Sequence, residues 1–356
     1  MVDAEAALAA ACVVEGLISP QAGASILEAL RQGQLDVNAI AAEAGEHATP
    51  VIGLVRQLRD RVGEQYAEAV HLGATSQDIV DTAAMLVAQR ALEVILADAR
   101  AAGAAAERLA HTHRLTPMVG RTLLQQALPT SFGLVAAGWM VGLGRAVAEL
   151  ERVREQVLAV QMGGPVGARS PQIAARVAAT LGLAEPLLPW HTERTRPAAL
   201  AAGLGALAGV AGKVARDVCL LAQTELGELR EGGEGRGGSS AMAHKRNPVA
   251  AVSVLACSRR TPALVATMFA AMEQEQQRAA GAWQTEWGTL TELLTLTGSA
   301  VAWLADLLGH LQVDVERMQE NLDLLAQSGV QAAASPERRL ADAAELVDRA
   351  LAGVDR

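Results

Sequence analysis

Residues 198–218 read AALAAGLGALAGVAGKVARDV, and this stretch predicts the fold of the chain. Its residues are apolar on nearly every side of a helix, and a helix of that kind must be buried all round. Residues 293–308, LLTLTGSAVAWLADLL, have the same character. A single four-helix bundle would expose part of both segments, so we expect association of several copies to complete the bundle core.

Composition favours an all-α fold. The chain has 356 residues, of which 51% are hydrophobic, but only eight are aromatic (five Trp, two Phe and one Tyr). Alanine is abundant instead, which suits close-packed helices better than sheets, whose strands draw on aromatic and β-branched residues. We therefore predict a long central helical bundle.

Proline positions outline the helices, because proline ends or kinks a helix. Three long stretches lack proline, and apolar residues recur within them at intervals of three and four. The spacing predicts long helices at about 77–113, 130–161, 197–230 and 271–312. We expect three domains: a helical cap (1–76), the central bundle (77–312) and a short C-terminal helical remnant (313–356).

Several protein classes are disfavoured. The net charge of −9 comes without a clustered basic face, which argues against nucleic-acid binding. Cys12, Cys219 and Cys257 are isolated, so neither disulfides nor a structural zinc site is expected. The apolar run before Lys213 is shorter than a membrane span, and no signal peptide is evident. We expect a cytoplasmic protein that does not bind a membrane and needs neither a metal nor another cofactor.

Three polar segments interrupt the apolar helices. In the first, HLGATSQDIVDTA (71–83), Thr75 or Ser76 can cap the following helix, with Asp78 completing a capping box. The second, TPMVGRTLLQQALPTSFG (116–133), predicts a non-helical or kinked crossing. There, Arg121 either pairs with a surface carboxylate or serves a site.

The third segment, EGGEGRGGSSAMAHKRN (231–247), is rich in glycine and ends in hydroxyl, imidazole, ammonium and amide groups. A flexible linker has similar glycine content but does not need those groups. We interpret the segment as a mobile loop that carries an acid or base and a cation, and that closes over an anionic substrate.

Together these segments resemble, in order and spacing, the three signature regions of the fumarase/aspartase superfamily. The third signature is S-S-x-M-P-x-K-x-N, and here the chain reads SSAMAHKRN (239–247). The stretches HLGATSQD, TPMVGRT, LPWHTERTR and RAAGAWQTEW are similar to the branch that lactonises 3-carboxy-cis,cis-muconate. The resemblance implies an all-α homotetramer whose active sites each take the three regions from different subunits.

The chain departs from the related lyases at several positions. Leu123 replaces a histidine that follows G-R-T, and Gln277 stands where a glutamate supports that histidine. Ala243 occupies the place of the motif proline. A lead segment before the first helix and the C-terminal domain of longer members are expected to be absent. The loss of the histidine and its glutamate favours the cycloisomerase branch.

The resemblance implies a cofactor-independent cycloisomerase of protocatechuate breakdown that acts on a small anionic polycarboxylate. It implies catalytic roles for Ser239, Lys245 and His71. The substrate-binding residues it implies are Thr75, Ser76, Arg121, Thr122, Gln125, Ser240, Met242, Asn247, Arg278 and Trp283. Two alternatives stay open: a β-elimination lyase for adenylosuccinate or argininosuccinate, and a catalytically silent helical scaffold.

Overall fold

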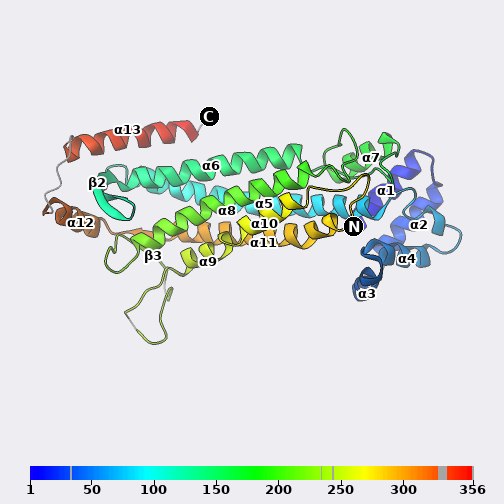
Figure 1. Cartoon of the computed structure of the whole chain (residues 1–356), viewed down its shortest axis with the longest axis horizontal. Coiled ribbons are helices and arrows are strands. Elements are labelled where there is room, and N and C mark those ends of the chain that lie inside the picture. The colour runs from blue at the N-terminus through cyan, green and yellow to red at the C-terminus, as the bar shows by residue number, and fades with distance from the viewer. Residues whose placement is uncertain (33, 234, 243, 328–334, 355–356) are drawn as a thin grey trace. The chain divides into compact units, whose positions relative to one another are not determined.

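Helices make up most of the chain, which confirms the all-α prediction. The computed structural model describes residues 1–32, 34–233, 235–242, 244–327 and 335–354. The helices are α1 (Val2–Val14), α2 (Pro20–Arg31), α3 (Val37–His47), α4 (Val51–Val62), α5 (Ser76–Thr112), α6 (Phe132–Gln156), α7 (Pro171–Leu181), α8 (Thr195–Leu221), α9 (Val249–Ser258), α10 (Thr261–Ala270), α11 (Ala282–Gly309), α12 (Val315–Gln327) and α13 (Pro336–Val354), with a 3-10 turn at Ala67–Ala69 (Figure 1).

Contacts between Cα atoms divide the chain into two compact units. Unit 1 comprises Met1–Leu92, Arg152–Ala201 and Val265–Thr291. Unit 2 comprises Glu93–Glu151, Ala202–Leu264 and Glu292–Arg356. Helices α5, α6, α8, α10 and α11 each supply residues to both units.

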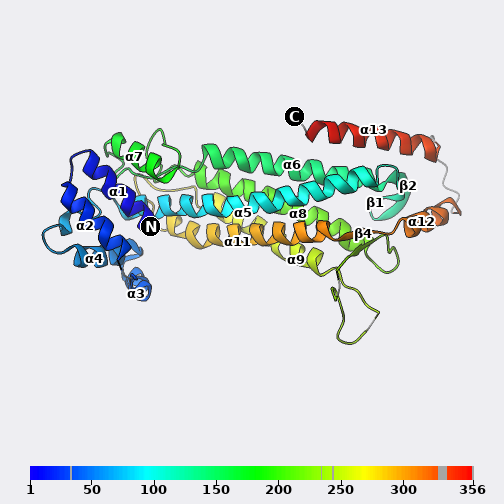
Figure 2. The same ribbon diagram turned by 180° about the vertical axis from the view of Figure 1, so that it is seen from behind.

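Unit 1 contains the short N-terminal helices. Helix α1 packs against α2 and α7, and α4 packs against α2 and α3 (Figures 1 and 2). Leu8, Ile26, Leu54 and Leu58 fill its core. The hydroxyl of Ser19 accepts a hydrogen bond from the Ala22 backbone N–H (3.1 Å), so a capped Ser-Pro pair begins α2 as that sequence favours.

Unit 2 is built around parts of four long helices that run alongside one another in both views (Figures 1 and 2). Small residues allow this close packing: a Cβ atom at Gly142 would lie 3.3 Å from Val210, and one at Gly212 would lie 2.6 Å from the Ser258 hydroxyl. Along α8, Leu204, Leu207, Ala211, Val214 and Val218 are fully buried. The recurrence of buried residues at three- and four-residue intervals is that of an amphipathic helix.

The second polar segment forms a β-hairpin rather than a simple crossing. Strand β1 (Pro117–Thr122) pairs with β2 (Gln125–Ser131) in an antiparallel ladder. Leu123 and Leu124 form its two-residue turn with φ values of 52° and 65°. A second short ladder joins β3 (Leu229–Glu231) to β4 (Leu311–Val313). Only the second ladder depends on pairing between segments far apart in the sequence, whereas β1 and β2 are joined by a local turn. Helical periodicity reveals neither ladder.

The ends of two predicted helices differ from those observed. Helix α8 ends at Leu221 rather than near 230, and α11 begins at Ala282 rather than near 271. Between α10 and α11 the backbone of Gln276 has a φ of 45°, which a continuous helix excludes. Residues 271–281 therefore form a loop, and this loop contributes to the site described below.

In the part of the chain that the structure describes, three segments are long and apolar enough to cross a membrane by length and composition alone: Phe132–Gln156, Thr195–Leu221 and Val249–Ala270. The sequence argument that the charge at Lys213 makes the run too short is therefore wrong for the second of them. In that segment, 56% of the most apolar window is buried inside the structure.

Candidate active site

A tight turn leads into α5 in unit 1. The backbone N–H of Ala74 donates to the carbonyl of His71 (3.2 Å), and Gly73 has a φ of 66°, which suits glycine in such a turn. Asp78 Oδ2 accepts from the Thr75 backbone N–H (3.1 Å), so the acidic half of the predicted capping box is present. The Thr75 hydroxyl instead contacts the guanidinium of Arg278. The Thr75 hydroxyl and the Arg278 guanidinium therefore lie together at the N-terminus of α5.

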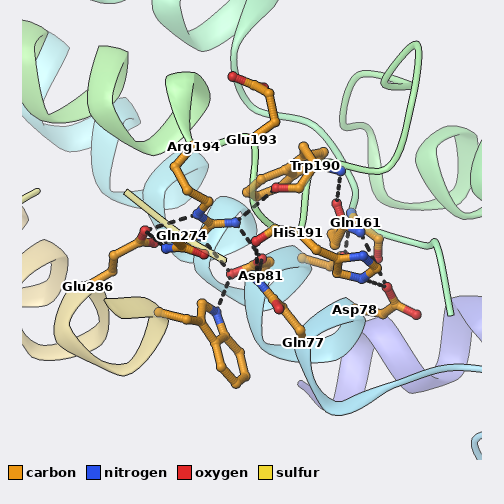
Figure 3. A network of polar contacts seen from close by, with 12 residues as sticks. Gln77, Asp78, Asp81, Gln161, Trp190, His191, Glu193, Arg194, Gln274 and Glu286 are labelled. Carbon is orange, nitrogen blue, oxygen red and sulfur yellow. Dashed lines mark hydrogen bonds and ion pairs between the residues drawn. The ribbon is translucent and has the colours of Figure 1, made fainter. Parts of the chain in front are cut away.

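Asp78 is the centre of a buried hydrogen-bond network (Figure 3). Its carboxylate accepts from His191 Nε2 (2.8 Å) and from the backbone N–H groups of Gly163 and Gly164 (2.9 Å each). A side chain on Gly163 would lie 2.8 Å from the His191 ring, so only glycine allows this approach. Burial opposes ionisation of Asp78, but the hydrogen bonds from His191 and the two glycines leave its pKa below the ordinary value.

A second buried cluster contains two carboxylates around one guanidinium (Figure 3). Arg194 donates to Asp81 (2.8 and 3.2 Å) and to Glu286 (2.9 Å from Nε), and it stacks over Trp190 at 4.8 Å. Burial lowers the pKa of Arg194, but the attraction of the two carboxylates outweighs it and raises that pKa. Burial also raises the pKa of Glu286, against the effect of Arg194. Gln77 and Trp283 donate further hydrogen bonds to Asp81 (3.1 and 2.9 Å).

Arg278 connects this cluster to the turn before α5. Its guanidinium lies 5.8 Å from the centre of the Trp283 ring, and burial lowers its pKa, although Asp78 and Asp81 oppose the shift. The predicted residues His71, Thr75, Ser76, Arg278 and Trp283 therefore all belong to unit 1. A guanidinium beside hydroxyl groups at a helix N-terminus suits a carboxylate ligand.

The hairpin residues belong to unit 2. Arg121 forms a two-pronged ion pair with Glu228 (2.7 and 2.9 Å), which also accepts from Asn321 (2.7 Å). Glu228 is completely buried, so the partner of Arg121 is not the surface carboxylate considered from the sequence. Thr122 and Gln125 are exposed beside the hairpin turn.

The glycine-rich loop also belongs to unit 2 and projects away from the helices of that unit (Figures 1 and 2). Asn247 ties its base by donating to the carbonyl of Gly237 (2.7 Å from the backbone, 3.1 Å from the side chain). Glu231 accepts from the first N–H groups of α9, at Ala250 (3.1 Å) and Ala251 (2.9 Å). Hydrogen bonds therefore hold both ends of the loop, at Glu231 and at Asn247. Ala243 lies outside the described residues.

The described tip of the loop is largely exposed. Ser239 Oγ accepts from the backbone N–H groups of Ala241 (3.3 Å) and Met242 (3.2 Å), while Ser240, Met242 and Lys245 are exposed. A cavity of about 960 Å³ lies beside it and is lined by Met242, Lys245 and Asn247 together with Arg230, Arg236 and Glu231. The full lining carries charges of both signs, because it also includes Arg246, Asp314 and Glu316.

The structure thus gathers one group of predicted residues in unit 1 and two groups, on the hairpin and the loop, in unit 2. Sequence reasoning missed Asp81, Glu286, His191 and Arg194 as members of the buried networks. A signal was present, because LPWHTERTR places several polar residues in an otherwise apolar chain. Within the described residues, no group of three or more His, Cys, Asp or Glu side chains is arranged to hold a metal ion.

Comparison with known proteins assigns the family. Residues 1–261 match the model of a family described as lyase. This chain belongs to that lyase family. It is 45% identical to a 3-carboxy-cis,cis-muconate cycloisomerase from Bradyrhizobium diazoefficiens over 91% of this chain and 74% of the relative. It is 42% identical to a nitrosuccinate lyase from Streptomyces davaonensis, over 98% of this chain and 78% of the relative.

The fold also matches that of a solved enzyme. The crystal structure of the 3-carboxy-cis,cis-muconate lactonizing enzyme from Pseudomonas putida superposes with a TM-score of 0.86 at 37% identity. The match covers 99% of this chain and 83% of that one. The resemblance drawn from the three sequence segments is therefore confirmed at the level of family and fold.

Proposed function

We propose that this protein is a cycloisomerase that closes 3-carboxy-cis,cis-muconate to 4-carboxymuconolactone. The similarity to several enzymes of that name, at 38–45% identity, is the observation that carries the proposal. Leu123 agrees with it, because the histidine of the related lyases is missing from this hairpin turn.

In the reaction one substrate carboxylate oxygen adds to a carbon–carbon double bond conjugated to another carboxylate. A carbon–oxygen bond forms while the π electrons move onto that second carboxylate as an aci-carboxylate. A proton then binds the carbon next to it, which completes the lactone. Charge accumulates at the aci-carboxylate, so fixed cations and hydrogen-bond donors there lower the barrier.

The cluster in unit 1 is suited to hold a substrate carboxylate. Arg278, the hydroxyls of Thr75 and Ser76, and the N-terminus of α5 all favour an anion there. Trp283 supports Arg278 through its ring face. His71 adjoins the same turn and is one of three candidate proton donors.

The glycine-rich loop supplies the other two candidate donors, Ser239 and Lys245. Closing it over the substrate would exclude water and bring the Lys245 ammonium to the developing negative charge. Asn247, Ser240 and Met242 are assigned to substrate binding, together with Arg121, Thr122 and Gln125 of the hairpin. Arg121 can bind substrate only if its guanidinium contacts the substrate while it is also paired with Glu228.

We further propose a cytoplasmic homotetramer with active sites shared between copies. On the exposed side of α8, Ala202, Ala206 and Gly209 form a smooth strip, and Trp303 of α11 is 41% exposed. Small residues of this kind allow another helix to approach closely. The apolar helices are on this view the core of an assembly and not membrane spans. The division into a cap, a central bundle and a C-terminal remnant stays a prediction.

A β-elimination lyase is the second candidate. The nitrosuccinate lyase relative supports it, since its similarity extends over 98% of this chain. Elimination from a substituted succinate needs the same stabilisation of an aci-carboxylate. There the aci-carboxylate forms by loss of a proton from carbon and collapses by loss of the leaving group, whereas in the cycloisomerisation it forms by addition of the carboxylate oxygen and is consumed by protonation. Leu123 argues against an adenylosuccinate or argininosuccinate lyase. A catalytically silent scaffold is the remaining alternative.

A substrate panel followed by ultraviolet absorbance tests the proposal. The panel contains 3-carboxy-cis,cis-muconate, nitrosuccinate, adenylosuccinate, argininosuccinate and fumarate. We expect the diene absorbance of carboxymuconate to disappear rapidly and the other substrates to be turned over slowly or not at all. Preferred turnover of nitrosuccinate would establish the elimination reaction instead, and inertness toward the whole panel would support the scaffold.

A further inference from the structure

A buried carboxylate lies behind the candidate acid His71. Oε1 of Glu5 is 2.6 Å from Nδ1 of the His71 ring, although the two residues are 66 positions apart. Glu5 is on α1 and His71 is on the turn before α5, and both belong to unit 1. The Glu5 side chain is 2% exposed and that of His71 is 15% exposed.

Glu5 is out of place on the buried face of α1. The other buried residues of that helix are alanines, Leu8 and Cys12. A carboxylate buried among apolar side chains destabilises the fold unless it is hydrogen-bonded. Within the described residues, the only side-chain hydrogen bond recorded for Glu5 is the one to His71. An apolar side chain at position 5 would pack there without needing a partner, so packing alone does not explain the Glu5–His71 pair.

The turn holds His71 in an unusual backbone conformation. Its φ is 60°, in the left-handed region that disfavours a residue with a side chain. The turn is fixed from another side as well, because Arg169 donates to the carbonyl of Leu72 (2.7 Å). Strain retained in a turn that borders a ligand site is a common sign of function.

The geometry determines which ring nitrogen is available. An ionised carboxylate can only accept hydrogen bonds, so beside ionised Glu5 the Nδ1 atom of His71 is the ring nitrogen that donates. Nε2, on the opposite edge of the ring, makes no hydrogen bond recorded for the described part of the chain. Nε2 is therefore the ring nitrogen that can interact with a ligand. His71 is only four positions before Thr75 in the sequence.

We propose that Glu5 is a positioning residue that fixes the tautomer and orientation of His71, so that Nε2 serves the carboxylate site at Thr75, Ser76 and Arg278. This rests on the proposed function, in which that site binds a substrate carboxylate. Glu5 does not touch substrate and acts only through the imidazole. A buried carboxylate behind a histidine has the same orienting effect in hydrolytic triads.

A double-mutant cycle tests the proposal. Glu5→Gln keeps the shape of the side chain but removes its charge, and we expect it to lower kcat/KM by about 10-fold or more. In a His71→Ala background the same substitution should have no further effect, because the residue through which it acts is gone. Asp3→Asn is the matched control: it is on the same helix, pairs with Arg90 and should leave kcat/KM unchanged.

Chemical rescue separates positioning from structural support. Free imidazole should partly restore activity to His71→Ala while Glu5 is intact, and should fail to restore it in the Glu5→Gln/His71→Ala protein. If Glu5→Gln does not fold alone, Glu5→Gln/His71→Gln replaces the charged pair by two amides and provides the folded reference. The proposal would be overturned if the fold-losses in kcat/KM of the two single variants multiplied in the double variant, which means additive free energies. It would also be overturned if imidazole rescued His71→Ala equally with and without Glu5.

The outcome is distinguishable from failure of the proposed function. The cycle is run on whichever substrate of the panel is turned over, and in parallel on calorimetric binding of propane-1,2,3-tricarboxylate, which needs no turnover. Non-additivity in binding with no turnover of carboxymuconate would retain the role of Glu5 and reject the cycloisomerase. Turnover of carboxymuconate with additive effects of the two substitutions would retain the cycloisomerase and reject the role of Glu5.

Discussion

His191 Nε2 lies 2.8 Å from Oδ1 of Asp78, and both side chains are almost completely buried. Asp78 is also the residue that accepts from the Thr75 backbone N–H. One carboxylate thus anchors the start of α5 to the segments around Gly163 and His191. The position of the Thr75 and Ser76 hydroxyls depends on this anchor.

Asp78→Asn should destabilise the protein by about 3 kcal/mol, since it leaves buried donors without their charged acceptor. The folded-state pKa of Asp78 is depressed, so its contribution is present above the unfolded pKa, near 4, and is lost only as pH falls through the lower folded value. Urea unfolding at pH 8 and pH 9, both above the ordinary titration range of a histidine, should therefore give the same difference. Glu93→Gln, exposed on the same helix, should change stability by less than about 0.5 kcal/mol.

Glu286→Gln should show the opposite dependence on pH. The pKa of Glu286 is raised in the folded state, so its contribution is fully present below the unfolded pKa and is lost as pH rises through the folded one. Relative to the wild type, the variant should become more stable as pH is raised from 5 to 8. A stability difference that stays constant across this range in urea unfolding would contradict the raised pKa.

Lys245→Ala should lower kcat by on the order of 10²-fold or more, because it removes a cation that acts on charge developing in the transition state. Ser239→Ala should lower it similarly if that hydroxyl transfers the proton, and much less if it only binds. The chain has only one other lysine, Lys213, which pairs with Asp217 and serves as a matched control. Unchanged kcat in Lys245→Ala, with normal thermal stability, would show that the loop is a solvated linker.

Leu123→Asn combined with Leu124→Gly should stabilise the hairpin. A two-residue turn with positive φ at both positions favours Asn-Gly, and a left-handed residue with a large side chain costs on the order of 1 kcal/mol. The gain should appear as a higher urea midpoint. Leu187→Asn removes an equally exposed leucine at ordinary φ and should have no such effect. No gain would mean that the leucines are held by contacts with another copy.

Shared active sites predict complementation between variants. His71→Ala disables the cluster of unit 1 and Lys245→Ala disables the loop of unit 2. If each site takes these parts from different copies, co-expression should recover activity that neither variant has alone. Light scattering should give a tetramer for each protein. A monomer mass at micromolar concentration, or tetramers without recovery, would reject the shared site.

The sequence alone determined the helical architecture and the family. Helical periodicity is a local property, so the apolar spacing indicated α5, α6, α8 and α11, three of them almost wholly within the long proline-free stretches, although the ends of α8 and α11 were misplaced. The segment SSAMAHKRN was specific enough to indicate the superfamily without any structure. The contact between Asp78 and the Thr75 N–H was also predictable, because a capping box joins residues only three positions apart.

Only the tertiary structure decided which polar groups meet. Asp78 pairs with a histidine 113 positions away, Arg121 with a carboxylate 107 positions away and His71 with one 66 positions away. Local pattern carries no information about such partners, since they are chosen by how helices pack. The two leucines of the hairpin turn show the same limit: turn preferences favour asparagine and glycine there, and the pairing of β1 with β2 overrides them.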